Sequence, residues 1–177
     1  NPGRDFMHSI ERQDEQLAAV GITDVKPADL AWVRADTARF GLASRFALLV
    51  PSAALHRPAK RWAAVNFARL AAGLAADGVE PVILGGAGER TLVNEIKIAA
   101  VAIRDLTGLT TLADLAVLAR DAAGAVGNDT GPMHMIAAAG CPSVVLFSRE
   151  SDPALAAPRG PAVTILRRDD LGDLTVA

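Results

Sequence analysis

The stretch VGNDTGPMHMIAAAGCPSVVLF, residues 126–147, joins an apolar run, a polar turn, a helical segment and a second apolar run. Gly131 and Pro132 are typical of the first turn of a helix, and Gly140 is typical of a helix end. The run 142–147 has the composition and length of a buried strand. A strand, a helix and a strand in this order predict a right-handed crossover between parallel strands.

The same alternation continues on the amino-terminal side of this stretch and beyond its end. Strands are predicted at 46–51, 80–86, 105–108, 123–127, 142–147 and 162–166, and helices at 61–78, 89–102, 110–122 and 131–140. This pattern predicts an α/β fold, a Rossmann-like doubly wound parallel sheet of about six strands. Aromatic residues make up only 4% of the chain, and a core of Ala, Val, Leu and Ile suits a parallel sheet covered by helices.

The residues before the first predicted strand have a different pattern. Segment 9–22 has a polar surface, with Ser9 as a possible cap and Gly21 as its end, so a solvent-facing helix is expected there. Turn signals at Pro27 and Asp29 precede a short helix expected at 30–39. We therefore divide the chain into a helical lead-in or linker, residues 1–40, and one Rossmann-like domain, residues 41–177.

Composition and charge disfavour several classes of protein. The chain has 177 residues, of which 51% are hydrophobic, and a net charge of −2, so no broad basic face and no nucleic-acid partner are expected. The single cysteine and three separated histidines provide neither a disulfide framework nor a metal cluster. No apolar run approaches the ~20 residues of a membrane span and no signal peptide is visible, so a cytoplasmic protein without a transmembrane segment is expected.

Polar residues gather where the predicted strands end. In open parallel sheets, ligands bind beyond the carboxyl ends of the strands. Such ends are followed by polar residues in 51–62, 85–90, 128–134 and 148–153. A single polar loop has an ordinary explanation in solvent exposure or helix capping, but their combination predicts the rim of a binding site.

The turn 128–134 is the most specific of these loops. A helix that begins near Gly131 presents free N–H groups and a partial positive charge, which suit a phosphate. Asp129 and Thr130 either cap this helix or contact a ligand, and His134 is either a half-buried core residue or a neighbour of the ligand. Lys60, which follows the first strand, could reach a phosphate as a point charge.

The glycine-rich segment GGAGER, residues 85–90, is partly similar to the dinucleotide-binding glycine pattern. It lacks the third glycine and follows the second strand, so a nicotinamide-dependent oxidoreductase is a poor fit. Glu89 either accepts hydrogen bonds from a ribose or sugar hydroxyl, or is an acidic residue that favours the helix dipole. The chain contains no serine elbow of the G-x-S-x-G type and no Walker lysine motif.

Together, residues 51–74, 81–89 and 126–147 resemble the carboxy-terminal half of the ADP-heptose:lipopolysaccharide heptosyltransferases, glycosyltransferase family 9. The motif D-T-G-P-x-H and the preceding element K-R-W carry the resemblance. It implies a GT-B architecture, in which two Rossmann-like domains form the active site between them and the carboxy-terminal one holds the nucleotide sugar. It further implies ADP-heptose or a related nucleotide sugar as the donor substrate, with no metal and no cofactor.

The resemblance also implies a set of ligand-contacting positions. Lys60 matches the lysine at the phosphates, and Asp129 matches the aspartate at the heptose hydroxyls. Thr130 and Gly131 match the two residues at the diphosphate, with His134 close by. Glu89 matches the acidic residue near the ribose or sugar, and Ser52 matches the hydroxyl after the first strand. No catalytic residue is expected in this chain, because the family's proposed catalytic base lies in the amino-terminal acceptor domain.

Two positions depart from the family pattern within the matching region. Ala63 replaces the proline that usually follows K-R-W, and residues 147–150 read F-S-R-E where the family has F-G-x-T. For a complete enzyme, the resemblance implies inverting transfer to a lipid-linked saccharide in lipopolysaccharide core biosynthesis, at the cytoplasmic face of the inner membrane. The alternative is a non-catalytic nucleotide-binding or interaction module that kept this fold.

Overall fold

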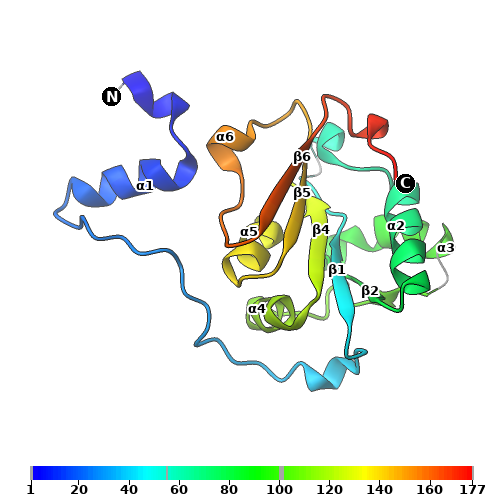
Figure 1. Cartoon of the computed structure of the whole chain (residues 1–177). Coiled ribbons are helices and arrows are strands. Elements are labelled where there is room, and N and C mark those ends of the chain that lie inside the picture. Colours follow the sequence, from blue (N-terminus) through cyan, green and yellow to red (C-terminus); the bar gives the residue numbers. More distant parts are fainter. Residues whose placement is uncertain (1, 55, 100–101, 177) are drawn as a thin grey trace.

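The computed structural model describes residues 2–54, 56–99 and 102–176, and its centre is a six-stranded sheet in the order β3-β2-β1-β4-β5-β6 (Figure 1). All neighbouring strands are parallel. The strands are β1 (Phe46–Val50), β2 (Glu80–Ile83), β3 (Arg104–Asp105), β4 (Gly124–Asn128), β5 (Ser143–Phe147) and β6 (Val163–Arg167). The predicted parallel sheet is thereby confirmed.

Helices cover both faces of this sheet, as expected for a doubly wound fold. On one face, α2 (Ala64–Ala76) and α3 (Arg90–Ala99) pack over a core that contains Leu49 and Ile83. On the other face, α4 (Leu112–Asp121) and α5 (Gly131–Ala138) pack over a core that contains Leu48. Because side chains alternate along a strand and both faces are covered, β1 is buried at every residue and its sequence is a continuous apolar run.

The strand order places the candidate rim at the switch point of the sheet. The chain passes from β1 to β2 on one side of the sheet, and β4 pairs with the other side of β1. This reversal is the topological switch point, and open α/β sheets bind their ligands beyond the carboxyl ends of the strands at such a point. It therefore brings the loop after β1 beside the turn between β4 and α5.

The lead-in helix α1 (Ser9–Ala18) forms, but His8 caps it in place of Ser9. The buried His8 accepts a hydrogen bond from Ile10 N at Nδ1, at 3.2 Å, and its Nε2 lies 3.0 Å from the Ala157 carbonyl. Because that carbonyl only accepts, Nε2 carries the proton. His8 thereby connects α1 to the end of α6 (Pro153–Ala156), near which α1 lies in Figure 1.

The short helix expected at 30–39 is wrong. Only a 3-10 turn, η2 (Ala38–Phe40), forms in this segment. Arg120 on α4 donates hydrogen bonds at 2.8–3.1 Å to backbone carbonyls of the linker, those of Leu30, Ala31 and Val33. Instead of a helix, the backbone forms an isolated turn in which Val33 N donates to the Leu30 carbonyl at 3.0 Å, and the Arg120 guanidinium holds this turn against α4.

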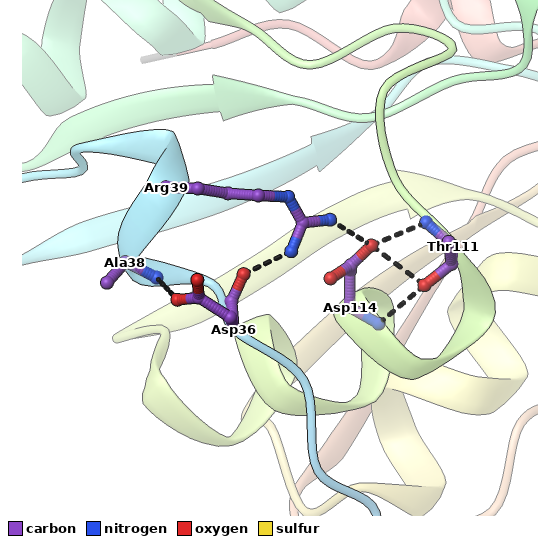
Figure 2. A network of polar contacts seen from close by, with 5 residues as sticks. All are labelled: Asp36, Ala38, Arg39, Thr111 and Asp114. Atoms are coloured by element: carbon purple, nitrogen blue, oxygen red, sulfur yellow. Dashed lines mark hydrogen bonds and ion pairs between the residues drawn. The ribbon is translucent and has the colours of Figure 1, made fainter.

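A polar network attaches the end of this linker to α4 (Figure 2). Arg39 donates to Asp114 Oδ2 at 2.6 Å and also to the Asp36 carbonyl. Thr111 and Asp114 form a reciprocal capping box, since the Asp114 amide donates to the Thr111 hydroxyl and the Thr111 amide donates to the Asp114 carboxylate. The carboxylate of Asp114 is 2% exposed, so these donors replace the water that it lost on folding.

The Asp114 network predicts an acid-dependent loss of stability. Burial by itself would raise the pKa of Asp114, but the hydrogen bonds from Arg39 and Thr111 outweigh burial and hold the pKa below its ordinary value. The stabilisation is therefore complete above the unfolded-state pKa of about 3.9 and is lost as the pH falls through the lower folded-state value. Asp114→Asn is expected to cost about 1–3 kcal/mol of unfolding free energy at neutral pH and to weaken the acid dependence.

Urea unfolding at a series of pH values measures this effect. Asp24→Asn is the matched control, because Asp24 is an exposed carboxylate of the linker, and its profile should follow the wild type. An Asp114→Asn profile as steep in acid as that of the wild type would contradict the role assigned to this carboxylate.

Candidate functional site

Three loops at the carboxyl edge of the sheet bring an ion pair and a hydroxyl together. Lys60, in the 3-10 turn η3 (Pro58–Lys60) after β1, places Nζ 2.5 Å from Oδ2 of Asp129, which follows β4. Ser151, in the loop after β5, donates its hydroxyl to the same oxygen at 2.7 Å. The side chains of Lys60 and Asp129 are 13% and 7% exposed, so the pair is largely shielded from water. The structure thus joins two of the predicted ligand residues.

Asn128, the last residue of β4, holds the loop after β1 in place. It is completely buried, and its Oδ1 accepts a hydrogen bond from Trp62 N at 3.1 Å. Its Nδ2 donates to the Pro51 carbonyl at 2.7 Å, with the Ser52 carbonyl at 3.5 Å. One amide therefore binds both ends of the segment that carries Lys60.

The K-R-W element has a structural part as well as a charged one. Trp62 is 4% exposed, meets the Phe67 ring edge-on at a centroid distance of 5.0 Å, and donates from Nε1 to the Leu174 carbonyl at 2.7 Å. Arg61 donates to the Ala53 carbonyl at 3.1 Å. The tryptophan and arginine anchor the loop, which leaves Lys60 as the charged residue directed at Asp129.

The first turn of α5 is open at its amino end. Thr130 is the N-cap residue, yet its side chain makes no capping hydrogen bond, so the interpretation of Thr130 as a side-chain cap is wrong. Asp129 also does not cap the helix through its carboxylate in the described structure, since that group binds Lys60 and Ser151. A Cβ added at Gly131 would meet no atom within 4 Å. The helix N-terminus and its partial positive charge are therefore accessible to an anion.

His134 lies one turn into α5 and is half-buried. Burial lowers its pKa, the negative charge of Asp129 opposes this effect, and His8 adds to it. At neutral pH the imidazole is therefore uncharged and can either donate or accept a hydrogen bond. Within the described residues, no hydrogen bond or ion pair joins His134 to Lys60 or Asp129, so ligand contact by His134 stays a prediction.

Glu89 and Ser52 are not joined to the ion pair. Glu89 Oε2 accepts a hydrogen bond from Gly86 N at 2.6 Å, and a Cβ added at Gly85 would lie 2.8 Å from that oxygen. Ser52 is buried, and its carbonyl faces the amide of Asn128. Within the described residues, no hydrogen bond or ion pair links either side chain to Lys60 or Asp129. Ligand contact by Glu89 and Ser52 stays a prediction.

Sequence reasoning missed two residues of this site, Asn128 and Ser151. Asn128 directly precedes the D-T-G-P motif, and an amide side chain at the end of a predicted strand was the available signal. Counting from Phe147 along the F-G-x-T pattern puts Glu150 at the threonine position, whereas the hydroxyl lies one residue further on. A match to the family pattern position by position therefore does not point to Ser151.

Other features of the described chain do not compete with this site. A hollow of about 560 Å³ lies at the opposite edge of the sheet, and Arg45 is its one charged lining residue. Among the residues described, no cluster of three or more His, Cys, Asp or Glu side chains is arranged to bind a metal. No helix in the same ranges combines the length and the apolar character that crossing a membrane requires.

Comparison with known proteins identifies the family. The sequence profile of glycosyltransferase family 9 (heptosyltransferase) matches residues 13–174. The chain belongs to this family. Lipopolysaccharide heptosyltransferase 2 from Salmonella typhimurium is 35% identical to the family 9 chain over 99 residues, which are 53% of this chain and 28% of that relative. The protein of the same name from Escherichia coli gives the same values.

Solved structures confirm the fold of the family 9 chain. The structure of E. coli ADP-heptose lps heptosyltransferase II matches with a TM-score of 0.70 and 27% identity, over 86% of this chain and 49% of that one. E. coli heptosyltransferase WaaC with ADP matches with a TM-score of 0.74 and 22% identity, over 96% of this chain and 53% of that one. The chain therefore spans about half the length of these two structures, in agreement with one Rossmann-like half of a GT-B fold.

Proposed function

We propose that this family 9 domain binds a nucleotide sugar, ADP-heptose or a related compound, for an inverting glycosyltransferase of lipopolysaccharide core biosynthesis. The observation that carries the proposal is the shielded Lys60–Asp129 pair beside the open N-terminus of α5. The Lys60 ammonium suits a diphosphate, and the Asp129 carboxylate suits sugar hydroxyls. The position at the switch point of a parallel sheet supports the same ligand class.

The proposed division of roles follows from the chemistry of the two side chains. Lys60 is a compact charge on a flexible stem, so it can leave Asp129 and bind a diphosphate that lies against the N–H groups of α5. Asp129 only accepts when ionised, so it binds hydroxyl donors and repels phosphates. Thr130 and Gly131 are assigned to the diphosphate, and His134 to the neighbouring part of the donor.

In the complete enzyme, the acceptor hydroxyl of a lipid-linked saccharide loses its proton to a carboxylate of the amino-terminal domain and attacks the anomeric carbon as ADP leaves. Lys60 and the start of α5 stabilise the negative charge that grows on the leaving diphosphate. No cofactor enters this proposal, and the chain of 177 residues is expected to bind the donor without transferring it. We place the complete enzyme in the cytoplasm, in peripheral contact with the inner membrane.

Calorimetric titration with ADP and with ADP-heptose tests this division of roles. Lys60→Ala is expected to weaken both ligands by about 10–100-fold, the size of one charge-assisted hydrogen bond. Asp129→Asn is expected to weaken ADP-heptose by a similar factor, and to leave ADP unchanged or tighter because Lys60 loses its internal partner.

Arg57→Ala is the matched control, since it removes one positive charge from the same exposed loop. It should change neither affinity by more than about twofold, because Arg57 is exposed and its hydrogen bond to the Glu150 carbonyl is long, at 3.4 Å. Absence of binding by the wild type, or equal losses in Arg57→Ala and Lys60→Ala, would overturn the site. Binding of ADP with no preference for ADP-heptose would favour the non-catalytic nucleotide-binding module.

A further inference from the structure

We infer that Ser151 is a positioning residue that holds the Asp129 carboxylate toward the sugar while Lys60 binds the diphosphate. This inference rests on the proposed function and deepens it, because it assigns a residue outside the predicted set. Ser151 comes from the loop after β5, a third strand end beside those that carry Lys60 and Asp129.

The two carboxylate oxygens of Asp129 differ in their partners. Oδ2 receives the Lys60 ammonium at 2.5 Å and the Ser151 hydroxyl at 2.7 Å. Within the described residues, no hydrogen bond reaches Oδ1. Oδ1 is therefore the oxygen left to accept a hydrogen bond from a ligand hydroxyl, and its direction depends on what holds Oδ2.

Ligand binding changes the number of donors at Oδ2. In the free protein two donors hold this oxygen, so either one is sufficient to orient the carboxylate. When a diphosphate takes the Lys60 ammonium, Ser151 is the donor that remains. The outer torsion of an aspartate is broad and has no strong intrinsic preference, so the carboxylate would rotate without that hydroxyl. The contribution of Ser151 is thus concentrated in the ligand-bound state.

The backbone on both sides of Ser151 is held by local hydrogen bonds. The buried Ser148 accepts a bond from Glu150 N at its hydroxyl, at 3.2 Å, and its carbonyl lies 3.5 Å from Ser151 N. Asp152 caps α6 by accepting a bond from Ala154 N at 3.0 Å. A turn before the serine and a helix cap after it direct its hydroxyl toward Asp129 before any ligand arrives.

The ratio of ADP-heptose affinity to ADP affinity tests the inference in the full chain. Ser151→Ala is expected to lower this ratio by about tenfold, the size of one hydrogen bond to a charged group. ADP affinity should stay close to the wild-type value, because ADP has no heptose hydroxyl that the Asp129 carboxylate must face. The urea unfolding midpoint should also stay close to the wild-type value, because Lys60 still holds Asp129 in the free protein. Ser151→Thr keeps the hydroxyl and is expected to restore the ratio.

A double substitution separates positioning from a general structural effect. In an Asp129→Asn background, Ser151→Ala should cause no further change in the ratio, since the group that it orients is already altered. A purely structural serine would lower both affinities or the unfolding midpoint in either background.

The possible outcomes distinguish the inference from the function on which it rests. A wild-type chain that binds neither ligand would overturn the proposed function together with the inference. A wild-type chain that binds both ligands, combined with an unchanged ratio in Ser151→Ala or no recovery in Ser151→Thr, would overturn the inference alone.

Discussion

Replacement of Gly127 by alanine is expected to destabilise the protein by about 1–3 kcal/mol, because a side chain at this position overfills the core. An added Cβ would lie 2.8 Å from Val50 Cβ and 2.6 Å from the sulfur of Met133. Met133 can move its flexible side chain, but Val50 lies on β1, directly opposite Gly127 in the strand register. The methyl group therefore forces apart two paired strands or displaces α5.

Urea unfolding of Gly127→Ala and Gly73→Ala measures this effect against a matched control. Gly73 lies inside α2, where an added Cβ would meet no atom within 4 Å. Alanine is favoured over glycine in a helix by about 1 kcal/mol, so the control is expected to gain stability. Similar destabilisation by both substitutions would show that the clash at β4 is not the cause.

Replacement of Asn128 by alanine is expected to cost about 2–4 kcal/mol of unfolding free energy and to abolish detectable ADP binding. The substitution leaves the Trp62 amide and the Pro51 carbonyl buried without their partner, and each such group costs about 1–3 kcal/mol. Because the same amide holds both ends of the loop that carries Lys60, the ligand site is lost together with the stability.

Asn66→Ala is the control for the Asn128→Ala substitution. Asn66 is also buried, but within the described part of the chain its side chain makes one hydrogen bond, to the Leu174 carbonyl at 3.3 Å, so a loss of about 1 kcal/mol and normal ADP binding are expected. Titration with ADP at a temperature where each variant is folded separates the loss of binding from the loss of stability. Retention of wild-type affinity by folded Asn128→Ala would contradict the proposed support of the Lys60 loop.

Most of the fold followed from local pattern. The strand β5 (Ser143–Phe147) and the helix α5 (Gly131–Ala138) begin and end within two residues of the predicted bounds, because proline and glycine limit them. The predicted helix that does not form, residues 30–39, lies in the linker. Its carbonyls bind Arg120 of α4, roughly 90 positions along the chain, and a local pattern contains no information on such a partner.

The candidate site was likewise predicted in part from the sequence. Residue types and the D-T-G-P-x-H motif predicted Lys60 and Asp129 as ligand residues, and the alternation of strands and helices predicted the edge of the sheet where they lie. Only the tertiary structure shows that their charges meet at 2.5 Å across 69 positions of sequence, that Asn128 supports them and that Ser151 shares the same oxygen. The sequence determines secondary structure through short-range periodicity and turn chemistry, whereas the partners of a buried polar group are decided by packing between segments far apart in the chain.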